Sequence, residues 1–191
     1  MNANQIVSTL AVSLVALSPT LRAQTPSASP TPAADTAMFH PFVVPPGASR
    51  SPGKIAVKVS GADNGGAFAV LEVPTAKGAA PPLHMHHVEN EWFYVLEGAY
   101  DVRVGDLVVH LTPGGSVYGP RMIPHTWRDV GPNGGRLLVV AQPAGQIEAF
   151  TRDLEALTAA GSPDPKAFAA LFAKHNMEIV GPPLPKPPGT E

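Results

Sequence analysis

Proline restricts what this chain can fold into more than any other residue type. It occurs 23 times in 191 residues, against roughly 5% in average proteins. Proline cannot donate a backbone hydrogen bond and it breaks the interior of a helix, so a helical bundle is disfavoured. Between the prolines and glycines lie short runs rich in β-branched and aromatic residues, whose starts are mostly 8–16 residues apart. We therefore predict a mainly β protein built from many short strands.

The β-rich runs end before residue 142. They cover residues 54–60, 67–73, 91–98, 99–104, 106–111, 116–119, 126–130 and 136–141. The periodicity then changes, because Ile147, Phe150 and Leu154 recur at helical spacing, and Asp164-Pro165 is typical of a helix start. Strands and helices do not alternate, which argues against a nucleotide-binding α/β fold. We expect a β domain followed by one or two α-helices.

Charge and cysteine content exclude several functions. The chain has 13 basic and 15 acidic side chains, a net charge of −2, and no run of Lys or Arg, so a nucleic-acid partner is not expected. It has no cysteine, which excludes disulfides, zinc fingers and thiol catalysis. A bound metal ion would have to use His, Asp, Glu or backbone oxygen.

The first 23 residues have the pattern of a cleavable signal peptide. Ile6 to Leu17 form a mostly apolar run of 12 residues, which fits the roughly 7–15 of a signal core and falls short of the roughly 20 of a membrane span. Leu21-Arg22-Ala23 is a candidate cleavage site before Gln24, although the start of the chain lacks Lys and Arg. We predict a secreted or periplasmic protein without a stable membrane span.

Composition also predicts how the rest of the chain is organised. We expect a disordered linker rich in Pro, Ser, Thr and Ala over residues 24–37 and a proline-rich tail over residues 181–191. Between them, we expect the β domain over residues 38–144 and a helical flank over residues 145–180. The expected partner is a small-molecule substrate, and a homodimer is compatible with this organisation.

Four of the seven histidines lie within or beside two of the predicted strands. His84 and His86 are two residues apart in a strand, so their side chains share one face and can converge on a cation. Glu91 opens a very apolar run, where an unpaired carboxylate is costly and a metal would supply its partner. His125 follows Pro124, 39 residues after His86. Three imidazoles and a carboxylate suit one divalent transition metal, such as Fe, Mn, Ni, Cu, Co or Zn, with positions left for substrate.

Neighbouring residues leave alternatives open. A purely structural role in the core is the alternative for the three histidines. Glu89 replaces Glu91 as ligand if the intervening turn differs by one step. His87 has the opposite parity to His86, which predicts a surface or supporting position. The candidate substrate-pocket residues lie on the aromatic strand and near His125; they are Phe93, Tyr94, Tyr118, Met122 and Trp127.

The spacing of these residues resembles the two motifs of the cupin superfamily. Gly78-x5-His84-x-His86-x4-Glu91-x6-Gly98 is similar to the first motif at every defined position. Gly114-x5-Pro120-x-Met122-x2-His125-x3-Asp129 is similar to the second, with Met122 in place of the usual glycine and Asp129 in place of the usual asparagine. The resemblance covers about residues 55–143 and implies a jelly-roll β-barrel of six to eight strands, with the metal inside its mouth.

Within the superfamily, the chain looks most like the cupins that include quercetin-dioxygenase-like proteins. This resemblance implies a metal-dependent oxygenase that acts on a small enolisable or polyphenolic substrate, with Glu91 as a ligand and a catalytic proton acceptor. Two alternatives use the same metal site. They are a non-catalytic or sensory module that binds a small molecule, and a germin-like manganese enzyme. Because the cupin fold hosts many unrelated reactions, the fold does not decide between them.

Overall fold

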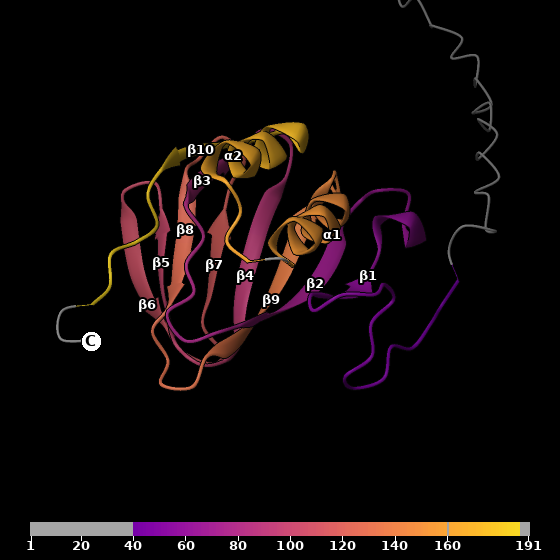
Figure 1. Cartoon of the computed structure of the whole chain (residues 1–191). Coiled ribbons are helices and arrows are strands. Elements are labelled where there is room, and N and C mark those ends of the chain that lie inside the picture. The colour runs from indigo at the N-terminus through magenta and orange to yellow at the C-terminus, as the bar shows by residue number, and fades with distance from the viewer. Residues whose placement is uncertain (1–39, 160, 188–191) are drawn as a thin grey trace, which may run out of the picture. The chain divides into compact units, whose positions relative to one another are not determined.

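A computed structural model describes residues 40–159 and 161–187 of the chain (Figure 1). These residues contain ten β-strands, a short 3-10 helix (Gly61–Asp63) and two α-helices, α1 (Ile147–Thr158) and α2 (Pro165–Lys174). The predicted signal peptide, the linker over residues 24–37 and the last four residues of the predicted tail lie outside the described residues.

The strands form two five-stranded antiparallel sheets. The first sheet has the order β1 (Ala56–Val59), β2 (Ala69–Thr75), β9 (Gly135–Gln142), β4 (Asn90–Glu97), β7 (Ser116–Gly119). The second sheet has the order β10 (Met177–Gly181), β3 (Leu83–His86), β8 (His125–Asp129), β5 (Tyr100–Val104), β6 (Leu107–Leu111).

The mainly β prediction is confirmed, and so are the two C-terminal helices. The sheets have the double-stranded β-helix arrangement of the cupin type, but strand pairing stays within each sheet, so the described strands form no closed barrel. The described residues also contain more strands than the predicted six to eight. Strand β10 was not predicted, because its short run is stabilised by pairing with β3, far earlier in the chain.

The core lies between the inner faces of the two sheets, and strand alternation decides which side chains enter it. In β4 the buried residues are Glu91, Phe93 and Val95, whereas the residues between them are more exposed. In β5 the buried residues are Tyr100 and Val102. Burying one large apolar side chain contributes roughly 1.5–3 kcal/mol, so these faces hold the sheets together.

One glycine of the first motif is required by a close backbone approach. Gly98 joins β4 to β5 with a φ of +84°, and a Cβ built there would lie 2.8 Å from the carbonyl oxygen of Gly134. The two motifs are linked elsewhere, since the Gly78 N–H donates to the carbonyl oxygen of Asp129 at 3.1 Å. This hydrogen bond joins the first residue of the first motif to the last residue of the second.

The two helices follow the last strand of the first sheet. Asp164 caps α2 by accepting hydrogen bonds from the N–H groups of Lys166 and Ala167, and Pro165 occupies its first turn. Helix α2 packs against β10 and α1, and Figure 1 shows α2 beside β10 and β3. Within the part of the chain that the structure describes, neither helix is long and apolar enough to cross a membrane.

Candidate metal centre

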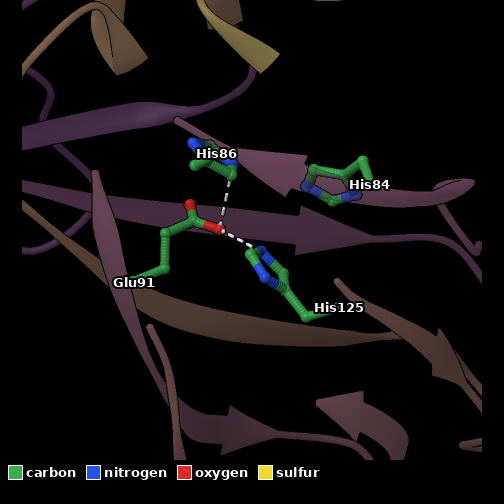
Figure 2. Close-up of side chains that lie close together, drawn as sticks. All are labelled: His84, His86, Glu91 and His125. Atoms are coloured by element: carbon green, nitrogen blue, oxygen red, sulfur yellow. Dashed lines mark hydrogen bonds and ion pairs between the residues drawn. The ribbon is translucent and has the colours of Figure 1, made fainter. Parts of the chain in front are cut away.

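Four buried side chains from three strands converge on one point (Figure 2). His84 and His86 come from β3, Glu91 from β4 and His125 from β8. One ligand atom from each residue lies within 4.8 Å of the corresponding atoms of the others. Both sheets contribute, because β4 belongs to the first sheet and the other two strands to the second.

Backbone carbonyls orient two of the imidazoles. His84 Nδ1 lies 2.9 Å from the carbonyl oxygen of Pro82, and His125 Nδ1 lies 3.0 Å from that of Ile123. A carbonyl oxygen can only accept, so Nδ1 carries the proton in both rings. In the neutral imidazole, Nε2 then has a free lone pair directed at the cluster, as in metal-binding histidines.

A carboxylate orients the third imidazole. His86 Nδ1 lies 3.4 Å from Oε2 of Glu89, and both side chains are almost completely buried. His86 Nε2 faces the cluster instead, 3.3 Å from Oε2 of Glu91. Glu89 therefore supports His86 from behind, and Glu91 is the carboxylate that joins the cluster.

The donor set fits a divalent cation. Glu91 Oε2 lies 3.0 Å from His125 Nε2 as well as 3.3 Å from His86 Nε2 (Figure 2). With their protons on Nδ1, both rings direct lone pairs at an anionic oxygen, and a cation between them would satisfy all three groups. Imidazole nitrogen and carboxylate oxygen are ligands that several divalent transition metals accept, so this set does not select one of them.

The pKa values of Glu91 and His84 favour their metal-binding forms, whereas that of His86 favours the protonated ring. Burial raises the pKa of Glu91, but the neighbouring His86 and His125 outweigh it and lower this pKa to about 2. Burial, with the nearby His125 and His86, lowers the pKa of His84 to about 3. Burial lowers the pKa of His86, but Glu91 and Glu89 outweigh it and hold this pKa above its usual value. At neutral pH Glu91 is thus ionised and His84 neutral, the forms that bind a cation.

The loop of the second motif is fixed to the strand of the first. Met122 has a φ of +64°, the left-handed conformation in which glycine is usual at this motif position. Its N–H donates to the carbonyl oxygen of His86 at 2.8 Å. Methionine therefore keeps the turn that glycine would make, and the turn leads through Pro124 into His125.

Comparison with known proteins agrees with this geometry. Residues 71–141 match the family described as "Cupin domain". The match supports the cupin superfamily. All four residues of the cluster lie inside the matched residues, and both C-terminal helices lie after them. No curated protein gives a match to the chain.

Three solved structures are each similar to about half of the chain. TT1209 from Thermus thermophilus is 29% identical, with a TM-score of 0.41 over 50% of this chain and 90% of that one. KdgF from Halomonas sp. is 20% identical, with a TM-score of 0.42 over 47% and 79%. An RmlC-like cupin from Shewanella frigidimarina is 24% identical, with a TM-score of 0.41 over 50% and 82%. Because the TM-scores are low, the cupin assignment rests on the family match.

A cavity of about 440 Å³ reaches the cluster from between the sheets and the helices. His84, His86 and Glu91 lie in its wall. The rest of the wall is mainly apolar, and its aromatic members are Phe93, Trp127, Phe150, Phe168 and Phe172. Residues 71–141 thus supply the polar end of the cavity, and α1 and α2 supply much of its apolar wall.

The structure divides the five predicted pocket residues into two groups. Phe93 and Trp127 line the cavity, whereas Tyr94, Tyr118 and Met122 do not. Tyr94 has the opposite strand parity to Phe93, and Tyr118 pairs with Trp92 on the same outer face of the first sheet. Met122 lies in a turn with 53% of its surface exposed, so its side chain points away from the cavity.

Two further features of the site were not evident from the sequence. Phe172 of α2 contacts His84, with 5.5 Å between the ring centroids in an edge-to-face arrangement. Glu89 is a partner of His86 rather than a member of the cluster. Only the packing of α2 brings Phe172 to His84, a residue far earlier in the chain. His87 lies at the surface, as its parity predicted, 3.6 Å from Glu178.

Proposed function

We propose that this chain is a metal-dependent cupin oxygenase that acts on a small, largely apolar substrate with an enolisable or phenolic oxygen. One observation carries the proposal: three imidazole nitrogens and a carboxylate oxygen converge at one end of a cavity whose remaining wall is mainly apolar. A ligand in such a cavity can place one oxygen at the cluster and its carbon skeleton against the aromatic wall.

The charges in the cavity wall support a neutral substrate body. Outside the metal centre, the charged lining residues are Lys54 and Glu155. Oε1 of Glu155 already accepts hydrogen bonds from the N–H groups of Lys54 and Ile55, both at 2.8 Å. The described wall therefore has no cluster of cations for a strongly anionic substrate, and a polyphenol or enolisable diketone suits it better.

The roles of the chain's own residues follow from their positions. A bound divalent metal would act as a Lewis acid that lowers the pKa of a substrate hydroxyl, and dioxygen is the oxidant. His84, His86, His125 and Glu91 would hold the cation, and the ionised Glu91 would also accept the hydroxyl proton. Phe93 and the aromatic residues of the helices exclude water from the reacting end of the substrate.

Oxygen uptake tests the proposal directly. We expect the protein loaded with one of Fe, Mn, Ni, Cu or Co to consume dioxygen with at least one flavonol, catechol or diketone. Glu91→Gln keeps a ligand oxygen but removes the basic carboxylate, so its rate should fall by about 10²–10⁴-fold while part of the metal is retained. His87→Ala is the matched control, because this surface histidine lies outside the cavity.

Two outcomes would contradict the proposal. Tight binding of these compounds without oxygen uptake, whichever metal is loaded, would favour a non-catalytic binding module. Activity confined to the manganese form, with oxalate or superoxide as substrate, would favour the germin-like alternative.

We also propose that the mature chain begins near Gln24 and acts outside the cytoplasm. The support is the apolar run of the first 23 residues with its small-residue exit. N-terminal sequencing of the natively expressed protein should find Gln24 or a neighbour. A soluble cytoplasmic protein that retains residues 1–23 would contradict this. The homodimer stays a prediction that light scattering can test.

A further inference from the structure

Glu89 connects the metal centre to the start of helix α1. Its carboxylate is 1% exposed. Oε2 faces Nδ1 of His86 at 3.4 Å, and Oε1 accepts a hydrogen bond from the N–H of Gln146 at 2.7 Å. Gln146 is the residue that immediately precedes α1. One buried carboxylate therefore contacts both a candidate metal ligand and the N-terminus of a cavity-lining helix.

The fit between Glu89 and this turn leaves no space for a side chain. Gly145 has a φ of +51°, and a Cβ built there would lie 1.9 Å from Oε1 of Glu89. Only glycine satisfies both the backbone conformation and the close approach. The Glu89 carboxylate can occupy its position only because residue 145 has no side chain. The turn before α1 is held in return by the hydrogen bond from the Gln146 N–H to this carboxylate.

The helices meet the metal centre at a second place. Phe172 of α2 packs edge-to-face on His84, and its ring centroid lies 5.0 Å from that of Phe150 in α1. Strand β10, which follows α2, pairs with β3 so that Met177 is opposite His86. Both helices are therefore in contact, directly or through one residue, with the strand that carries two of the candidate ligands.

We propose that Glu89 is a positioning residue that couples metal binding at His86 to the docking of α1. A cation on Nε2 draws electron density from the ring, which strengthens the Nδ1–H donation to Glu89. A more firmly held Glu89 carboxylate holds the Gln146 N–H more firmly. Since such coupling is reciprocal, docking of α1 raises the metal affinity by the same factor. The inference rests on the proposed metal centre but not on its reaction.

Metal titration and hydrogen exchange test the coupling with Zn²⁺ as the probe. In Glu89→Gln we expect the dissociation constant for Zn²⁺ to rise by about 10–100-fold, the usual effect of losing such a partner. Glu178→Gln is the matched control, because this exposed glutamate contacts only the surface residue His87 in the described hydrogen bonds and ion pairs. Its affinity should equal that of the wild type.

Hydrogen exchange separates coupling from a general loss of stability. With saturating Zn²⁺, the amides of residues 146–150 should exchange more slowly in the wild type, and Glu89→Gln should lose this protection. The amides of β4, which carries Glu91, should gain protection in both proteins. Gly145→Ala is a second variant for the case that Glu89→Gln does not fold. Its new Cβ displaces the Glu89 carboxylate, so it should also remove the Zn²⁺-induced protection of residues 146–150.

Every outcome of these two experiments either supports or overturns the coupling between His86 and α1. Unchanged Zn²⁺ affinity in Glu89→Gln, or equal protection of residues 146–150 at saturating metal, would overturn the coupling. A wild type that binds Zn²⁺ without any change at α1 would overturn it too, and would leave the metal centre intact. A wild type that binds no divalent metal would overturn both the metal centre and the coupling.

Discussion

Replacing His125 by alanine should remove most of the stability that a divalent metal gives to the folded chain. The imidazole is almost completely buried, its Nδ1 is held by Ile123, and its Nε2 is 3.0 Å from Glu91. The remaining two histidines and the carboxylate would form a three-ligand site with no nearby replacement for the lost nitrogen.

The size of the effect can be worked from the number of ligands. Four-ligand zinc sites in small peptides bind with about 10–16 kcal/mol, so one ligand contributes roughly 2.5–4 kcal/mol, or about 10²–10³ in the dissociation constant. At a metal concentration 100 times the wild-type dissociation constant, the wild type gains about 2.7 kcal/mol and a variant that binds 100-fold more weakly gains about 0.4 kcal/mol. For a chain of this size, 1 kcal/mol shifts Tm by about 2–4 °C. The metal-induced rise in Tm should therefore fall from about 5–11 °C to about 1–2 °C.

Thermal unfolding with Zn²⁺ and with a chelator measures this rise for each protein separately. Each variant is its own reference, so the general cost of removing a buried ring cancels. His87→Ala is the control, because the His87 side chain is 43% exposed and lies at the surface, outside the cluster. Its metal-induced rise in Tm should match that of the wild type.

The reasoning is refuted if His125→Ala and His86→Ala both keep the full metal-induced rise in Tm and the full metal content. Such a result would mean that the convergence of the four residues is a structural arrangement of the core and that any metal binds elsewhere.

Two other predictions concern pH and the second motif. The pKa of His84 is about 3 in the metal-free fold, well below its ordinary value, so the unfolded chain binds more protons and stability falls as pH decreases. Between pH 6.5 and pH 5 we expect the free energy of unfolding of the metal-free protein to fall by about 1–2 kcal/mol. Urea denaturation with a chelator measures this fall, which should be smaller in His84→Gln. An equal fall in both proteins would contradict the role given to His84. At Met122, whose φ is +64°, glycine should change the free energy of unfolding by less than about 1 kcal/mol, whereas valine should lower it by about 1–2 kcal/mol. Denaturation curves measure both, and a valine variant as stable as the wild type would rule out the conformational argument.

Local periodicity explains what could be predicted about the site. Side chains two residues apart in a strand lie on the same face. This rule correctly placed His84 beside His86 and put His87 at the surface. The same rule showed that one face of the aromatic strand must be buried, but it left open whether Phe93 or Tyr94 belonged to it. The register of β4 between β9 and β7 decided for Phe93.

The chain's sequence by itself determined the strand-rich fold class, the two C-terminal helices and the candidate ligand set, because these depend on residue type and spacing along the chain. Only the tertiary structure decided which surfaces meet. It paired His125 with His84 on the neighbouring strands β8 and β3, and it placed Glu89 between His86 and Gln146. It also put the two helices along the cavity wall. Periodicity predicts which face of a helix or strand is buried. Which residues that face contacts depends on packing between segments far apart in the chain.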